Sequence, residues 1–357
     1  MSQLPCWKDT ITYIISKNGL DEGFSIVKKL YEKKPEFRPL CHFLTIGLGA
    51  SIYQKFPDYE KLSYSPISVT CNYGFYQKYP HSLLLATEDI KKAQKFCEYA
   101  GKELSSDVPG VESECFRGIG RGLPFVDKSI WGDARKMAKL AVDTCKSISP
   151  NESDYKNCLS GTFNMLGREQ VKKNYGISVN ESDPMWLCRE QSEEIRPYCW
   201  GNFKWVDTPE IKEDKNVSAA MLETIKKYEN DERVGASIIW TIGYEEGRKS
   251  VGENNSYDGI IRLCSNLPIS FQAPCISGFS VGLAKHSFPN RQHEAVLNFC
   301  QQVRDFEFLK NINCASQAIE YLKGFYSPSQ FKKMCTLLKI KLGISCAVKV
   351  SLSFEQL

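Results

Sequence analysis

Fifteen cysteines in a chain of 357 residues are the first candidates for chemistry, because their number is high for a chain of this size. Cysteines bond to one another in oxidising compartments, hold zinc as thiolates, or act as nucleophiles. Structural zinc sites usually carry their cysteines two to four residues apart, and no CxxC occurs in this sequence, so the spacing favours disulfides over a metal site. The closely spaced pairs are Cys97 with Cys115, Cys145 with Cys158, Cys188 with Cys199, Cys264 with Cys275, Cys300 with Cys314, and Cys335 with Cys346.

Each pair is expected to join the end of one helix to the start of the next. Antiparallel neighbouring helices bring such residues within the roughly 4.4 to 6.8 Å Cα separation that a disulfide needs. Before Trp240 the sequence lacks a cysteine both at the end of the preceding helical stretch and at the start of the next one. This joint absence is expected if the two cysteines of a pair are bonded to each other. Cys41 and Cys71 are expected to pair with each other, which leaves Cys6 free.

Six or seven disulfides predict an extracytoplasmic protein that is secreted, periplasmic or exposed at the cell surface. The segment 1–17 carries Lys8 and Asp9 where a signal peptide needs an unbroken apolar core, so export is expected to use a signal not visible here or one already removed. A cytosolic protein with incidental thiols is the alternative interpretation.

Three Gly-Arg pairs provide the candidate ligand-binding residues Arg121, Arg168 and Arg248. Arginine presents a planar fork of donors to a carboxylate, sulfate or phosphate. Their offsets from the expected starts of their repeats are 6, 10 and 8 residues, so the three side chains are not required to share one face. Solvated or locally paired arginines are the alternative.

Catalysis and cofactor binding have little support in the sequence. His42, His81, His286 and His293 are the only histidines, and His81 lies in the loop-like segment YPHS. No GxSxG, phosphate loop, HExxH or dinucleotide fingerprint occurs, so we expect no catalytic residue, no metal and no cofactor.

Glu245 and Glu246 are a candidate acid and base for glycoside hydrolysis if the helices closed into an α/α barrel. Adjacent helical carboxylates do not flank a glycosidic bond as that reaction requires, so an exposed charged turn is expected instead. The glycines of GIGRG, residues 118–122, resemble a phosphate loop but have no preceding strand, and are interpreted as helix-packing residues. Four N-x-Ser sequons, at Asn151, Asn180, Asn216 and Asn254, indicate surface loops that carry glycans if the host glycosylates them.

A repeat positions these residues. Cysteine followed three residues later by glycine recurs at Cys71, Cys115, Cys158 and Cys275, and Trp240 with Gly243 has the same form. With related positions included, repeat starts fall 30 to 44 residues apart, which is typical of stacked helical pairs. Apolar residues at helical spacing in 88–100, 133–145, 292–300 and 330–335 predict the second helix of each pair, the last one opened by Ser327 and Pro328.

The first helix of each pair is rich in glycine. Gly118 and Gly122, Gly243 and Gly247, and Gly278 and Gly282 each stand four residues apart. Glycine costs about 1 kcal/mol in a helix interior relative to alanine. Its recurrence on one face therefore predicts that the backbone of a neighbouring helix passes closely there.

The helical pair with glycine in its first helix resembles the tetratricopeptide-like class, above all the Sel-one-like repeats and their disulfide-containing relatives. The segment Trp240 to Cys264, WTIGYEEGRKSVGENNSYDGIIRLC, carries the resemblance in Gly243, Tyr244, Gly247 and Gly252. The segments LCSNLP and CISGFSVGL are also similar to cysteine-rich repeat proteins. The resemblance implies a fold and no particular function.

Composition agrees with a folded chain. Hydrophobic residues make up 42% and charged residues 25%, with a formal net charge of only +4 and no basic block, so nucleic acid is not an expected partner. No long uncharged apolar run occurs, so membrane insertion is not expected. The charge-rich stretch 207–234, at the joint without cysteines, is expected to be a hinge.

The sequence as a whole predicts an all-α, right-handed α-solenoid of about eight helical hairpins, forming a single array over 1–357 with disulfides between repeats. The leading functional prediction is a monomeric, non-enzymatic scaffold whose concave face binds a protein or peptide. A carbohydrate-active hydrolase on a closed α/α barrel and a structural cell-surface spacer are the alternatives.

Overall fold

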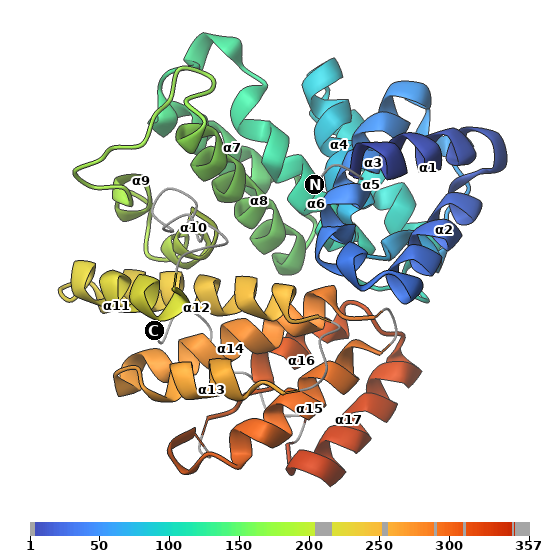
Figure 1. The fold of residues 1–357 in the computed structure, drawn as a ribbon. Coiled ribbons are helices and arrows are strands. Elements are labelled where there is room, and N and C mark those ends of the chain that lie inside the picture. The colour runs from blue at the N-terminus through green and yellow to red at the C-terminus, as the bar shows by residue number, and fades with distance from the viewer. Residues whose placement is uncertain are drawn as a thin grey trace. The chain divides into compact units, whose positions relative to one another are not determined.

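The computed structural model describes residues 4–203, 216–251, 256–288, 291–309, 312–344 and 346. The described residues are all-α, as the sequence predicted, with seventeen α-helices and no strand among them (Figure 1). Contacts divide the chain into unit 1, Met1–Val206, and unit 2, Asp207–Leu357. The division falls at the start of the stretch expected to be a hinge. Residues 207–215 of that stretch lie outside the described residues.

The described residues of unit 1, 4–203, contain ten α-helices and five short 3₁₀ helices. They are α1 (Leu4–Asn18), α2 (Leu20–Lys33), η1 (Pro35–Leu40), α3 (Cys41–Lys55), η2 (Tyr59–Lys61), η3 (Pro66–Val69), α4 (Gly74–Thr87), α5 (Ile90–Leu104), α6 (Val111–Gly122), η4 (Leu123–Phe125), η5 (Lys128–Ile130), α7 (Ala134–Ile148), α8 (Glu152–Val171), α9 (Trp186–Arg189) and α10 (Arg196–Phe203).

The described part of unit 2 contains seven α-helices and one 3₁₀ helix. They are α11 (Val217–Lys227), α12 (Glu232–Lys249), α13 (Asp258–Ser265), α14 (Ile269–His286), α15 (Gln292–Arg304), η7 (Glu307–Leu309), α16 (Ser316–Lys323) and α17 (Pro328–Leu342). None of the described helices in either unit combines the length and the apolar sequence needed to cross a membrane.

The second helices form where apolar spacing and capping residues predict them. In α5 the Asp89 side chain accepts a hydrogen bond from the backbone N–H of Lys92 at 2.9 Å, and Ala93, Cys97 and Ala100 are buried on one face. The predicted opening of α17 is confirmed, because Ser327 and Gln330 cap each other's backbone reciprocally. Helices α7 and α15 likewise cover the predicted segments.

Two details differ from the repeat pattern. Cys71 is a repeat start by its spacing to Gly74, but no helix begins at it, because Cys71, Asn72 and Tyr73 have φ values of 64°, 64° and 53° and form a left-handed turn before α4. His81 does not lie in a loop. It is buried inside α4 in spite of Pro80, whose ring packs against the position of Gly118 in α6.

Successive first helices pack against one another within each unit. In unit 1 the contacts run from α3 to α4, α6, α8 and α10, and in unit 2 from α12 to α14 and α16. Glycine permits this packing, as predicted. A Cβ atom at Gly161 in α8 would overlap the carbonyl oxygen of Arg117, and one at Gly120 in α6 would overlap that of Cys158.

The same reciprocal contact recurs in unit 2 and fixes the repeat register. Gly278 faces the carbonyl oxygen of Trp240, and Gly243 lies 2.5 Å, measured from a built Cβ, from that of Cys275. Trp240 therefore corresponds to Arg117, and Gly243 corresponds to Gly120. The sequence alignment had equated Trp240 with the repeat cysteine. In the structure Ile238, which is fully buried, takes the place of Cys115.

Seven disulfides, four within unit 1 and three within unit 2, join residues whose Cα atoms are 5.4 to 5.7 Å apart. Six are the local pairs expected from the spacing, and the seventh joins Cys41 to Cys71. Cys6 is exposed and free. Most of these bridges tie a second helix to the following first helix, for example Cys145 of α7 to Cys158 of α8.

Candidate functional site

The corrected register places the three candidate arginines on one face of their helices. Arg121 stands six residues after Cys115, Arg168 ten after Cys158, and Arg248 ten after Ile238. Positions six and ten are one helical turn apart, so they lie on the same side of a helix. The expected offset of 8 for Arg248 came from the misplaced Trp240. We call this set of positions the six–ten column.

In unit 1 the six–ten column meets a lysine that the sequence did not single out. Arg121 of α6 and Arg168 of α8 lie close enough to Lys78 and His81 of α4 to act on both electrostatically. The Nζ atom of Lys78 lies 3.3 Å from Nδ1 of His81. Arg121 and His81 are only 7% and 3% exposed. Four basic side chains from three consecutive first helices are therefore gathered in one place, which we call the basic cluster.

The packing of α4, α6 and α8 accounts for this gathering. The carbonyl oxygen of Gln77, next to Lys78, lies against Gly118, and the backbone N–H of Arg121 lies 3.1 Å from a built Cβ at Gly161. Glycine at these points brings the helix axes close together, so the side chains that follow along the same face converge.

The basic cluster shifts the pKa values of its own members. Burial, followed by repulsion from Arg121 and Arg168, lowers the pKa of Lys78 to about 8. Burial and the neighbouring cations also hold the pKa of His81 well below its usual value, so its imidazole is neutral near pH 7. Neutral His81 can accept a hydrogen bond from the Lys78 ammonium through an unprotonated Nδ1.

One carboxylate, Glu169, also acts on Lys78, but its oxygens are engaged by other groups. Its Oε1 accepts a hydrogen bond from Lys172 at 2.9 Å, and its Oε2 accepts one from Asn174 at 2.6 Å. The charged groups described around Lys78 thus carry an excess of positive charge. Arg121 and Arg168 also have further contacts within the chain.

Unit 2 fills the same column differently. The Nε atom of Arg248 lies 2.7 Å from Oε2 of Glu245, and both side chains are 17% exposed. Glu246 pairs in the same way with Lys249 at 2.7 Å. The two carboxylates considered for glycoside hydrolysis therefore each hold a cation on their own helix.

Tyr244 occupies in unit 2 the position that Arg121 has in unit 1. Its ring stacks on Trp240 with centroids 5.5 Å apart, and its hydroxyl lies 2.7 Å from Nε2 of His286. The Lys285 ammonium lies over the Tyr321 ring, 4.4 Å from the centroid. The column of unit 2 is consequently aromatic and locally charge-paired, whereas that of unit 1 is basic.

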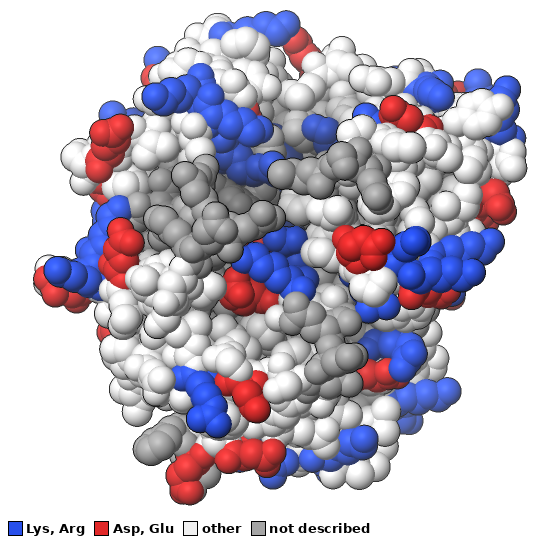
Figure 2. All heavy atoms as spheres, in the orientation of Figure 1, with Lys and Arg blue, Asp and Glu red and all other residues white. Residues whose placement is uncertain are grey.

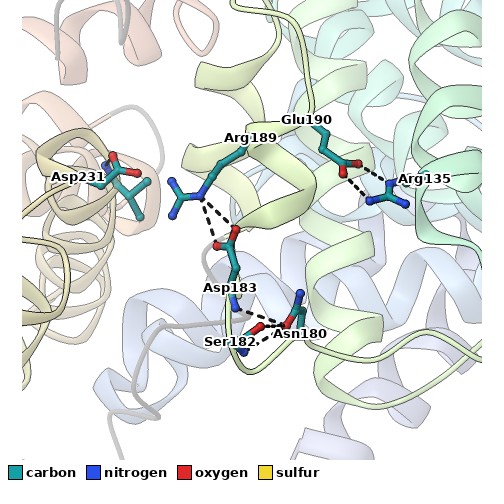
Figure 3. A network of polar contacts seen from close by, with 8 residues as sticks. Arg135, Asn180, Ser182, Asp183, Arg189, Glu190 and Asp231 are labelled. Atoms are coloured by element: carbon teal, nitrogen blue, oxygen red, sulfur yellow. Dashed lines mark hydrogen bonds and ion pairs between the residues drawn. The ribbon is translucent and has the colours of Figure 1, made fainter.

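The sequons lie at the surface where they are described. Asn180 is exposed in the segment between α8 and α9, where its Oδ1 accepts hydrogen bonds from the backbone and hydroxyl of Ser182 (Figure 3). The close view also shows Arg189 directed at Asp183 and Arg135 forming two hydrogen bonds to Glu190. Asn151 and Asn216 cap α8 and α11. Asn254 lies outside the described residues.

The surface charges are mixed in sign. On the face drawn in Figure 2, Lys and Arg side chains lie interspersed with Asp and Glu side chains. Within the described ranges, no group of three or more His, Cys, Asp or Glu side chains is arranged to hold a metal ion. The basic cluster differs from this mixed pattern, because its members are all basic.

Sequence reasoning found two of the basic cluster's members, Arg121 and Arg168, and missed Lys78 and His81. The search for Gly-Arg pairs could not find Lys78, which is a lysine and follows Gln77 instead of a glycine. A helical reading of the YPHS segment would have placed Lys78 and His81 on one face, three residues apart. No protein-family model, no curated protein and no solved structure matches this chain.

Proposed function

We propose that this protein is a non-enzymatic, extracytoplasmic scaffold that binds a protein or peptide along its stacked first helices. In this proposal the hairpins, about eight in number, form a right-handed solenoid of the tetratricopeptide-like kind. The six–ten column then follows its concave face. A repeat stack offers such an extended surface because each helix adds its side chains to those of the previous one.

The observation that carries the proposal is the convergence of Lys78, Arg121 and Arg168 from α4, α6 and α8. Basic side chains brought together from consecutive helices provide a local attraction for an acidic segment of a ligand.

The compartment follows from the disulfides. Seven bonded pairs and one free thiol among the described cysteines indicate an oxidising environment outside the cytosol. Disulfides between neighbouring helices suit a repeat stack, because each repeat contacts the repeats next to it.

Selection from a random dodecapeptide library with the full oxidised chain as bait tests the proposed function. Peptides should be enriched, and they should bind less tightly to an Arg168→Gln variant than to Arg135→Gln, which alters the exposed outer helix α7. Absence of any enriched peptide would overturn the proposal. Cleavage of an oligosaccharide panel would favour a hydrolase instead.

A further inference from the structure

We propose that Asn180 is the N-glycosylation site of the folded chain and accepts an oligosaccharide from a polyprenyl diphosphate donor. The inference goes beyond the proposed binding function and shares with it only the extracytoplasmic address. In the transfer, the Nδ2 atom of Asn180 forms a bond to C1 of the first sugar. The bond between C1 and a phosphate oxygen of the donor breaks, the lipid diphosphate leaves, and Nδ2 gives up one proton to a base of the transferase.

The first reason is that the whole sequon lies outside the helices. Asn180, Glu181 and Ser182 belong to the connection between the end of α8 at Val171 and the start of α9 at Trp186. All three are exposed, and Figure 1 shows the connection as a long loop at the edge of unit 1. A transferase must take the acceptor segment into its own active site, and a surface loop can be bound without unfolding a helix.

The second reason is that the connection is held at its two ends. The Tyr175 ring stacks on Phe125 with centroids 4.2 Å apart, and the carbonyl oxygen of Tyr175 accepts a hydrogen bond from the backbone N–H of Gly132 at 2.9 Å. At the other end, Met185 is fully buried. The exposed sequon lies between these anchors, so an enzyme can bind it while the rest of the unit stays folded.

The third reason is the orientation of the Asn180 side chain (Figure 3). Its Oδ1 atom accepts hydrogen bonds from the backbone N–H and the hydroxyl of Ser182, at 3.1 and 2.7 Å, and from the backbone N–H of Asp183 at 3.4 Å. None of the described residues accepts a hydrogen bond from Nδ2. The amide oxygen is therefore engaged locally, whereas the nitrogen that would carry the glycan is available.

The other described sequons are built into helix starts. Asn151 caps α8 and Asn216 caps α11, so the second and third residues of both sequons lie in the first turn of a helix. Asn151 also has both amide atoms occupied, because Oδ1 accepts from the backbone N–H of Asp154 at 3.0 Å and Nδ2 donates to its carboxylate at 2.6 Å. Asp154 is buried, so a sugar on that nitrogen would lie against a buried carboxylate. These two asparagines provide matched controls within the same chain.

The test is glycan transfer in solution to the folded, oxidised chain. The protein is incubated with a single-subunit oligosaccharyltransferase that requires only an Asn-x-Ser/Thr acceptor, and with a polyprenyl diphosphate oligosaccharide. Enzymatic release of the glycans in heavy-oxygen water converts each occupied asparagine to a labelled aspartate, which mass spectrometry measures site by site. Transfer to Asn180 should be at least about fivefold faster than to Asn151 or Asn216, because their helix caps must open first. The reduced, alkylated and unfolded chain should accept glycans at all three.

Absence of transfer to Asn180 in the folded chain would overturn the proposal, and so would an equal rate at Asn151 or Asn216. Ser182→Ala should abolish transfer to Asn180 and Ser182→Thr should retain it, since the acceptor motif needs a hydroxyl at its third position. Circular dichroism of the Ser182 variants distinguishes a lost acceptor from a lost fold. A failed transfer would leave the peptide-binding proposal standing, because the library selection tests that function separately.

Discussion

We expect Lys78 to lower the stability of the fold at neutral pH. Its ammonium is largely removed from water and lies near Arg121 and Arg168, and both effects disfavour the charged form. A side chain that destabilises the folded state and is nevertheless present at the meeting point of three helices is better explained by binding than by packing.

Replacing Lys78 with methionine should therefore stabilise the protein. The substitution keeps much of the apolar stem and removes the unfavourable charge, so the free energy of unfolding at pH 7 should rise by on the order of 1 kcal/mol after allowance for partial solvent exposure. Urea unfolding of the oxidised chain measures this change. A loss of more than 1 kcal/mol would show that the ammonium stabilises the fold.

The pH dependence of stability tests the lowered pKa of Lys78 independently. Between about pH 8 and the usual value of 10.5 the unfolded chain binds more protons at Lys78 than the folded chain does. The contribution of Lys78 to the free energy of unfolding should therefore rise with pH across that window. The difference between the wild type and Lys78→Met should shrink from pH 7 to pH 9.5, and a difference that grows would contradict the lowered pKa.

Two sequon asparagines differ in their structural roles. The Asn151 side chain accepts a hydrogen bond from the backbone N–H of Asp154 and donates one to the buried Asp154 carboxylate at 2.6 Å. Asn151→Ala should lower the free energy of unfolding by about 1 to 2 kcal/mol. Asn180→Ala, in an exposed segment, should change it by less than about 0.5 kcal/mol. Similar losses in the two variants would remove the distinction.

At the scale of the helices, glycine sets how closely the first helices approach. A Cβ atom at Gly278 would overlap the carbonyl oxygen of Trp240, whereas a Cβ atom at Gly259 in α13 has no neighbour within 4 Å. Gly278 lies in the middle of α14 and Gly259 near the start of α13, so alanine at the two positions compares a closely packed site with an open one.

Gly278→Ala should reduce the free energy of unfolding by about 3 kcal/mol, because α14 must move away from α12. Gly259→Ala should increase it by up to about 1 kcal/mol, since it restricts the unfolded chain without a clash. Thermal unfolding of the two variants and the wild type measures these two changes in stability. A stable Gly278→Ala protein would contradict the close approach.

The helices and their close packing could be predicted because both leave local marks in the sequence. Apolar spacing gave α5, α7 and α15, and glycines four residues apart gave the packed face. The turn at Cys71 could not be predicted, since Asn72 and Tyr73 adopt positive φ without glycine. The register of α12 was misread because Trp240 matches the repeat phrase in letters, while contacts between helices place Ile238 there.

The candidate site was predictable only in part for a related reason. Arg121 and Arg168 stand in a visible Gly-Arg pattern, whereas the approach of Lys78 depends on how α4 packs on α6. No regular spacing in the sequence connects Lys78 with Arg121 and Arg168, because the three residues lie on different helices. Their convergence becomes visible only once the register is known.

At the scale of the whole molecule, the disulfides contribute stability joint by joint. Cys145 and Cys158 are separated by 13 residues, and a loop of that size should contribute roughly 3 kcal/mol. The free energy of unfolding of the double variant Cys145→Ala/Cys158→Ala should therefore be lower by about 3 kcal/mol, and its urea midpoint should fall accordingly. Cys6→Ser, which alters an exposed free thiol, should leave the midpoint unchanged. Equal stability of both variants would contradict a structural role for the bridge.

The most direct measurement is non-reducing peptide mapping by mass spectrometry on folded protein recovered from an oxidising compartment. The account predicts six cross-linked peptide pairs between neighbouring repeat elements, a seventh between Cys41 and Cys71, and alkylation of Cys6 alone. Mostly free thiols, or bonds that skip a neighbour such as Cys145 to Cys199, would contradict the stapled stack and the extracytoplasmic address together.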